Sequence, residues 1–153
     1  MRIMTAEQYW EKFINEHPEY KGKSYTAWPF GADPDVLAEL VVSGKKTLTC
    51  SSLKEYEMEN ESLPEAGDIS IVLGADDTPK CIIENTKVYT IVFRDADEEI
   101  AYKEGEGDRT LSYWRKAHID FFEWLYPEMG LEFKEDEKIV VEEFKLIYVQ
   151  RYS

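Results

Sequence analysis

The sequence lacks any apolar stretch long enough to span a membrane, and its N-terminus lacks the pattern of a signal peptide. We therefore expect a cytoplasmic protein that has no membrane partner. Cysteine is scarce as well, because the chain has only Cys50 and Cys81, both in apolar, strand-like contexts. This usage favours reduced, buried thiols over a disulfide framework.

Histidine is as rare as cysteine, and no His/Cys cluster has the spacing of a zinc site. We expect no metal and no cofactor. His118, which is followed closely by aromatic residues, is expected to be a helix-surface or core residue rather than a ligand. The sequence also has no glycine-rich phosphate-binding fingerprint, no G-x-S-x-G elbow and no internal repeat.

Basic residues are also few relative to acidic residues. The chain has 18 Lys and Arg residues against 32 Asp and Glu residues, which gives a formal net charge of −14. Such a surface repels a polyanion over most of its area, so long duplex nucleic acid is not an expected partner. A local basic pocket for a single nucleotide or a short RNA remains compatible with this charge.

Apolar and aromatic residues are plentiful by contrast. They make up 43% and 14% of the 153 residues, enough for one sizeable core and one domain, residues 1–153. Alternating patterns predict strands near 46–50, 69–73, 80–93 and 139–149. Helical spacing and capping residues predict helices near 5–17, 34–43, 96–104 and 111–125. The fold class expected is α+β, a small curved β-barrel surrounded by helices.

Three further segments have predictions of their own. Residues 53–64 are acidic and mixed, which is compatible with a short helix or a flap. Residues 20–31 are predicted to be a loop because Gly22, Pro29 and Gly31 punctuate them. In the helix near 111–125, the expected buried stripe consists of Tyr113, Trp114, Ala117, Phe121 and Trp124.

Two large rings, Trp28 and Phe30, lie on that predicted loop. Taken alone, they are expected to plug the end of the barrel. The alternative is that they stack on a nucleobase, because aromatic side chains offer flat faces to bases.

The stretch from Ser43 to Ser52 is the centre around which the chain is organised. Gly44 can take the left-handed conformation that ends the preceding helix, and β-branched threonines then favour a strand. Strict alternation would place Lys46 and Thr49 on opposite faces, and a bulge or turn could reunite them. On local pattern alone, Lys45 and Lys46 are solvated lysines after a capping glycine.

This stretch resembles the G-x-K-x-x-(T/E) signature of ASCH domains, relatives of the PUA-like RNA-binding fold. Further landmarks are Gly67-Asp68 before a strand, Glu104 at a helix end, and the closing strand from Phe144 to Tyr148. Residues 28–31 and 104–109 resemble a subfamily of small bacterial ASCH proteins. The resemblance covers about residues 28–148, with the N-terminal helix packed on that unit. It implies a β-barrel with a cleft over its mouth.

One ASCH branch is an amidohydrolase that removes acetyl from 4-acetylcytidine. By this resemblance Lys46 is the nucleophile or an electrostatic clamp, Thr49 orients the reacting groups, and Glu104 transfers a proton. Trp28, Phe30, Lys45, Ser51 and Arg109 are the expected substrate-binding residues. The branch carries an arginine where this chain has Ser51, and Arg94 or Arg109 could supply that charge instead.

The resemblance leaves three functions open. A hydrolase acting on an N-acyl group of a modified nucleoside comes first. An RNA-binding or RNA-cleaving module comes second, and it requires a continuous basic strip near the site. A non-catalytic sensor of a nucleotide-like ligand is the third.

Overall fold

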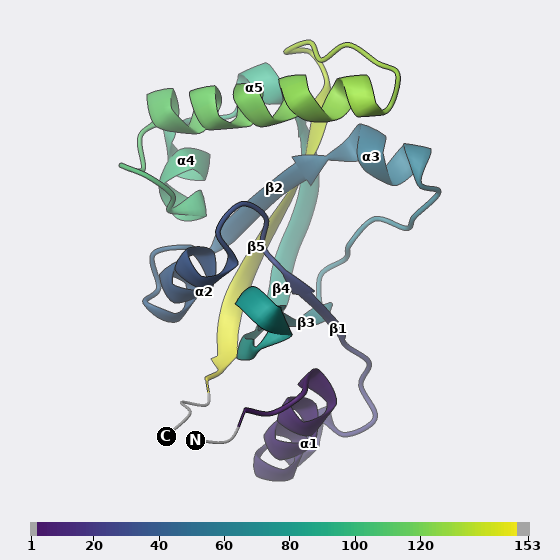
Figure 1. Cartoon of the computed structure of the whole chain (residues 1–153), viewed down its shortest axis with the longest axis vertical. Helices are drawn as coiled ribbons and strands as arrows, with labels where there is room; N and C mark the ends of the chain where they lie inside the picture. The colour runs from purple at the N-terminus through teal and green to yellow at the C-terminus, as the bar shows by residue number, and fades with distance from the viewer. Residues whose placement is uncertain (1–2, 150–153) are drawn as a thin grey trace.

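The structure is a computed structural model that describes residues 3–149; the remaining ends of the expected domain lie outside the described residues (Figure 1). Its helices are α1 Ala6–Glu16, α2 Pro34–Val42, α3 Leu53–Met58, α4 Glu98–Glu104 and α5 Leu111–Glu128. Its strands are β1 Thr26–Pro29, β2 Leu48–Ser52, β3 Ile69–Leu73, β4 Pro79–Val92 and β5 Lys138–Tyr148. Short 3-10 turns occupy Pro18–Tyr20, Ala75–Asp77 and Phe93–Asp95.

The five strands form one sheet in the order β1-β3-β4-β5-β2. Every neighbouring pair is antiparallel except β1 and β3, which run parallel. The long strands β4 and β5 lie side by side at the centre, and their register shifts near Ile83 and Asn85 (Figure 1). Such irregularities bend strands, so the sheet curls into a half-barrel with helices around it. This confirms the α+β curved-barrel prediction.

Side-chain caps fix where the helices begin. The hydroxyl of Thr5 accepts from the backbone of Gln8, whose side chain in turn accepts from Thr5 N–H, a full capping box. Asp33, Thr110 and Asp97 cap helices α2, α5 and α4 in the same way. These caps explain why the predicted helices are correct to within a few residues.

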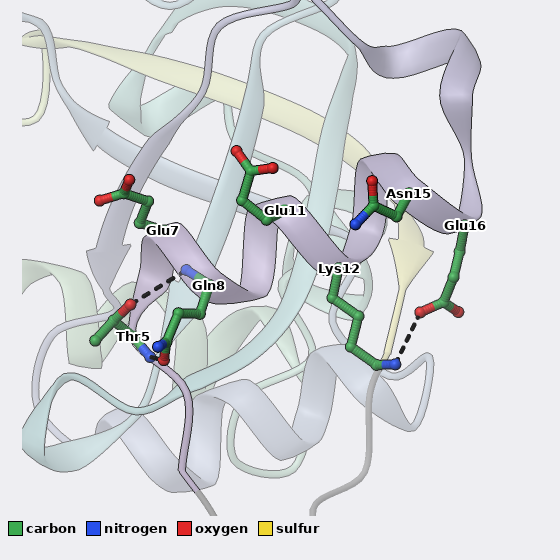
Figure 2. Close-up of a pocket in the computed structure, with 7 residues that line it drawn as sticks. All are labelled: Thr5, Glu7, Gln8, Glu11, Lys12, Asn15 and Glu16. Carbon is green, nitrogen blue, oxygen red and sulfur yellow. Dashed lines mark hydrogen bonds and ion pairs between the residues drawn. The ribbon is translucent and has the colours of Figure 1, made fainter.

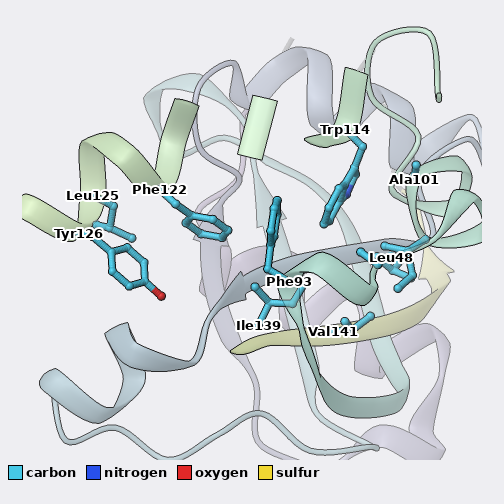
Figure 3. Close-up of a cluster of buried hydrophobic side chains, with 11 residues drawn as sticks. Leu48, Phe93, Ala101, Trp114, Phe122, Leu125, Tyr126, Ile139 and Val141 are labelled. Atoms are coloured by element: carbon cyan, nitrogen blue, oxygen red, sulfur yellow. The ribbon is translucent and has the colours of Figure 1, made fainter. Parts of the chain in front are cut away.

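Three apolar clusters hold the helices on the sheet. The largest lies between α5, α4 and the sheet, and Phe93 stacks on Trp114 within it, 5.3 Å between ring centroids (Figure 3). A second cluster seats α1 on the sheet through Tyr9, Trp10 and Phe13. The third packs α2 against Phe30 and the sheet.

Two element predictions are wrong in part. Residues Thr26–Pro29 are strand rather than loop, because they pair in parallel with β3 along its edge. A tertiary pairing of this kind has no local signal, and a proline is tolerated in an edge strand. Strand β2 begins at Leu48, so Lys46 precedes it and escapes the strict alternation expected at that point.

The predicted buried stripe of α5 is also wrong, except for Trp114. Tyr113, Phe121 and Trp124 are 45%, 50% and 62% exposed, and Ala117 is exposed as well. The buried side chains are Trp114, Phe122, Leu125 and Tyr126. This helix carries two apolar faces, and only its packing on the sheet decides which one is buried.

Candidate functional site

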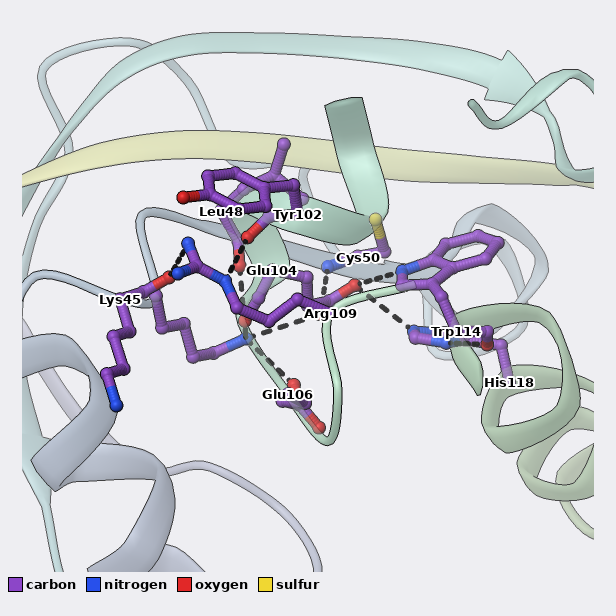
Figure 4. Close-up of polar contacts among 10 residues, drawn as sticks. Lys45, Leu48, Cys50, Tyr102, Glu104, Glu106, Arg109, Trp114 and His118 are labelled. Atoms are coloured by element: carbon purple, nitrogen blue, oxygen red, sulfur yellow. Dashed lines mark hydrogen bonds and ion pairs between the residues drawn. The ribbon is translucent and has the colours of Figure 1, made fainter. Parts of the chain in front are cut away.

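Lys46 is held at the junction between α2 and β2. Gly44 takes a left-handed conformation with φ of 84°, and Lys46 N–H then donates to Leu40 O over 3.0 Å. The Lys46 side chain is fully buried. Its Nζ donates to Leu48 O at 3.0 Å, to Glu104 O and Oε2 at 3.3 Å each, and to Glu106 Oε2 at 2.9 Å (Figure 4).

Glu104, the last residue of α4, is the centre of this polar network and is 3% exposed. Its Oε2 accepts from Lys46 and, at 3.1 Å, from the backbone N–H of Cys50. Its Oε1 accepts from Trp114 Nε1 at 2.7 Å and lies 3.3 Å from His118 Nε2 (Figure 4). The helix end thus brings Glu104 to Lys46 across 58 residues of sequence.

The same contacts complete the free edge of strand β2. Because Thr47 O accepts from Phe144 N on β5, alternation directs the polar groups of Leu48 and Cys50 away from β5. There Leu48 O meets the Lys46 ammonium and Cys50 N–H meets the Glu104 carboxylate. The ion pair therefore satisfies backbone groups that would otherwise be buried without partners.

The network is charged. Burial alone would lower the pKa of Lys46, but the carboxylates of Glu104 and Glu106 outweigh it and raise that pKa. Burial alone would raise the pKa of Glu104, but the Lys46 charge and the His118 hydrogen bond hold it below its usual value. Lys46 is thus an ammonium and Glu104 a carboxylate in this structure.

The surroundings of His118 favour its protonated form. Burial alone would lower its pKa, but the Glu104 carboxylate raises it above the ordinary value. Its Nδ1 lies 2.8 Å from Trp114 O and its Nε2 faces Glu104, so an acceptor faces each ring nitrogen. Both nitrogens donate only in the protonated ring.

The two thiols are poor nucleophiles here. Burial raises the pKa of Cys81 to about 12, and burial together with Glu104 raises the pKa of Cys50 well above its ordinary value. Both cysteines are free. Among residues 3–149, no group of three or more His, Cys, Asp or Glu side chains is placed to hold a metal ion.

A cleft of about 1070 Å³ lies on the inner side of the curled sheet. All five strands contribute to it, together with α3 and the loop between α3 and β3. Thr49 and Ser51 of β2 line it, and Ser51 donates to the hydroxyl of Tyr56 at 3.3 Å. Glu142, opposite Thr49 on β5, lines the floor and accepts from Asn85 at 3.1 Å.

Phe30 separates this cleft from the buried ion pair. Its side chain lines the cleft, while the ring centroid lies 5.0 Å from Lys46 Nζ. Trp28 packs edge-on against Phe30 with 4.9 Å between centroids and is half-buried in the cleft wall. Both rings therefore belong to the core and to the cleft at once.

Lys45 and Arg109 lie outside the cleft lining. The Arg109 guanidinium donates from Nη2 to Lys45 O at 3.1 Å and from Nε to Tyr102 O at 3.0 Å. It also lies 3.6 Å above the centroid of the Tyr102 ring (Figure 4). Arg94 is exposed and is likewise not part of the cleft lining. Neither arginine lines the cleft, so neither supplies it with the positive charge that the amidohydrolase branch carries at the position of Ser51.

Sequence reasoning missed several members of the site. Glu106, Trp114 and His118 complete the charged network, and Asn85 and Glu142 form the polar floor of the cleft. The spacing of four residues between Trp114 and His118 was a usable signal, because it puts both on one helix face. No local signal connects that face to Glu104.

A second depression, of about 680 Å³, lies along the outer side of α1 (Figure 2). Within residues 3–149, its side chains come only from that helix and its N-cap Thr5, and they include the Thr5–Gln8 capping box and the Lys12–Glu16 ion pair. It is an ordinary solvated helix face.

The family model of the ASCH domain matches residues 26–148, most of the chain. The chain belongs to the ASCH family. An ASCH domain from Lactobacillus crispatus JV V101 is 34% identical over 93% of each chain, with a TM-score of 0.87. A protein from Enterococcus faecalis V583 is 34% identical over 94% of this chain and 88% of its own, with a TM-score of 0.83. No curated protein matches.

Family membership brings the PUA-like fold with it. The curled sheet with helices around it agrees with that fold. Within residues 3–149, none of the helices has the length and apolar character needed to cross a membrane.

Proposed function

We propose that this ASCH protein is a hydrolase that removes an N-acyl group from a modified nucleoside, with 4-acetylcytidine as the reference substrate. The observation that carries the proposal is the position of Phe30, which lines the cleft and also covers the Lys46 ammonium. A ligand that displaces this ring would meet Lys46 directly. The family resemblance of Lys46, Thr49 and Glu104 to the amidohydrolase branch supports the same reading.

The charge of the cleft favours a nucleoside over a nucleotide or RNA. Among the described residues, four acidic side chains line it, those of Glu55, Glu61, Asp68 and Glu142, against the single basic side chain of Lys23. Phosphate groups would be repelled there, whereas an uncharged base and sugar would not. The RNA-module alternative needs a basic strip, and this lining does not supply one.

The proposed chemistry adds water across the amide bond: hydroxide joins the acyl carbon, and the leaving amine gains a proton. Because the pKa of Lys46 is raised, its role in this scheme is a clamp that stabilises the oxygen anion of the tetrahedral intermediate. Thr49 orients the acyl group from the cleft side. We assign to Glu104 the transfer of a proton from the attacking water to the amine, because a ligand that drew Lys46 away from this carboxylate would remove the main cause of its lowered pKa.

A second candidate, binding without turnover, is favoured by one specific observation. The Lys46 side chain is 0% exposed and its ammonium already faces Leu48 O, Glu104 and Glu106. A site that stayed closed in this way would bind a nucleoside on Trp28 and Glu142 and release it unchanged.

Binding and turnover of 4-acetylcytidine separate these candidates. Calorimetric titration measures binding, and chromatography measures release of cytidine and acetate. Release with multiple turnovers supports the hydrolase, and binding without release supports the sensor. If the protein neither binds nor cleaves acylated nucleosides, including 4-acetylcytidine, both candidates are wrong.

A further inference from the structure

Helix α5 presents an apolar stripe to solvent along most of its length. The stripe consists of Tyr113, Ala117, Phe121 and Trp124, whose spacing of three or four residues puts them on one face. Trp124 is 62% exposed, more than any other large apolar side chain in the described residues. Phe121 lies 5.9 Å from Trp124 between ring centroids, so the two rings form a continuous apolar surface.

The position of α5 makes this stripe accessible. The helix lies across the end of the molecule opposite helix α1 (Figure 1). Its other face is anchored in the core by Trp114, Phe122 and Leu125 (Figure 3). The stripe is thus a second apolar face on a firmly held helix, and it is distinct from the cleft.

Charged side chains flank the stripe, and the sign of their charge changes along the helix. Lys116 stands near the N-terminal half, and Asp120 and Glu123 follow towards the C-terminal half. Helical periodicity places these three on the same side of the stripe. Lys116 pairs with Asp120 within the chain at 3.0 Å, at an exposed position that is open to a further partner.

We propose that a second copy of this chain covers the stripe, with the two α5 helices antiparallel about a two-fold axis. In that arrangement Tyr113 of each copy meets Trp124 of the other, and Ala117 gives room beside Phe121. Lys116 of each copy then faces Glu123 of the other, so each contact between the copies occurs twice. In a parallel two-fold pairing the charged flanks of the two copies would lie on opposite sides of the interface, so Lys116 and Glu123 would not meet.

The order of charges is what selects a second copy as the occupant. Two chains of net charge −14 repel each other over most of their surfaces. On the flank of α5, a positive side chain of one copy can form an ion pair with a negative side chain of the other. An 18-residue helix is about 27 Å long, so one helix pair is a small interface and the dimer is weak, with a Kd in the micromolar range, on the order of 10 μM.

The test is sedimentation equilibrium of the full chain from about 1 μM to 500 μM, a range that brackets such a Kd. Wild type is expected to pass from monomer to dimer, whereas Trp124→Ser remains monomeric at every concentration. Tyr102→Ser is the matched control, because Tyr102 is 58% exposed but lies on α4. This control should dimerise like wild type.

Charge exchange tests the antiparallel register. Lys116→Glu and Glu123→Lys are each expected to weaken the dimer about tenfold, and the double variant is expected to return to within about threefold of wild type. A wild type that stays monomeric overturns the proposal, as does a dimer that Trp124→Ser leaves unchanged. Weakening without rescue in the double variant overturns the antiparallel arrangement. None of these results depends on the proposed hydrolase activity.

Discussion

Gly105 packs directly against the carbonyl oxygen of Lys45. It ends helix α4 in a left-handed conformation with φ of 78°, and a Cβ at this position would overlap the backbone of Lys45 and Lys46. The absence of a side chain lets the helix end reach the start of β2. This close approach is what delivers Glu104 to Lys46.

Gly105→Ala is therefore expected to destabilise the protein by more than the ordinary left-handed penalty of about 1–2 kcal/mol. The matched control is Gly130→Ala. Gly130 also ends a helix, with φ of 74°, but a Cβ there meets nothing within 4 Å. Chemical denaturation should show a clearly larger loss for Gly105→Ala, and equal losses would contradict the close packing of α4 on Lys45.

Breaking the buried ion pair is expected to cost far more than breaking a surface one. Glu104→Gln leaves the buried Lys46 with Glu106 as its remaining carboxylate, so we expect a loss of about 3 kcal/mol in the free energy of unfolding. The control is Glu99→Gln, which removes an exposed partner of Lys103 on the same helix and should cost about 0–1 kcal/mol.

The difference in stability between wild type and Glu104→Gln is expected to change with pH in one direction. The pKa of Glu104 is lowered from 4.5 in the folded protein, so its stabilising contribution is full above pH 4.5. It is lost as the pH falls through the folded-state pKa. Wild type and Glu104→Gln should thus converge in stability in acid; a gap that widens there would contradict the charged pair.

His118 is expected to titrate above its ordinary pKa of 6.5, and the cause is Glu104. NMR titration of the imidazole signals measures this, and His17→Gln assigns them because the chain has only two histidines. In Glu104→Gln the pKa of His118 should fall. Because the folded-state pKa is raised, the stabilisation from His118 is full below pH 6.5 and is lost as the pH rises through that pKa.

Trp28 is expected to contribute a stacking face to ligand binding. Trp28→Ala should weaken nucleoside binding by about 1–3 kcal/mol, measured by calorimetry. Tyr102→Ala removes an exposed ring outside the cleft and should leave binding unchanged. Equal affinity in wild type and Trp28→Ala would restrict Trp28 to a packing role against Phe30.

Elements with strong local signals were predictable from the sequence. The capping residues Thr5, Asp33 and Thr110 indicate where their helices begin, because a cap is a short-range interaction. Strand β1 was not predictable, because it exists only through its pairing with β3. In α5 the sequence shows two apolar stripes, and the choice between Trp114 and Tyr113 as the buried one is made by distant parts of the chain.

The candidate site also combines features that the sequence predicts with features that only the three-dimensional fold creates. The pairing of Lys46 with Glu104 could be anticipated only through the family resemblance, since no local pattern joins residues so distant in sequence. The role of Phe30 as the wall between the ion pair and the cleft follows from three-dimensional packing. The sequence alone could not show whether Phe30 forms this wall or only fills the end of the barrel.

The rate of cytidine release from 4-acetylcytidine in matched variants tests the central claim most directly. Thr49→Val removes one hydroxyl from the cleft with little change in shape, and Lys46→Arg keeps the charge without an amine. The proposed hydrolase mechanism predicts turnover by wild type, about 100-fold slower turnover by Thr49→Val, and reduced turnover by Lys46→Arg, whose larger head group does not fit the buried site. Turnover that is absent in wild type, or the same in all three proteins, would contradict it.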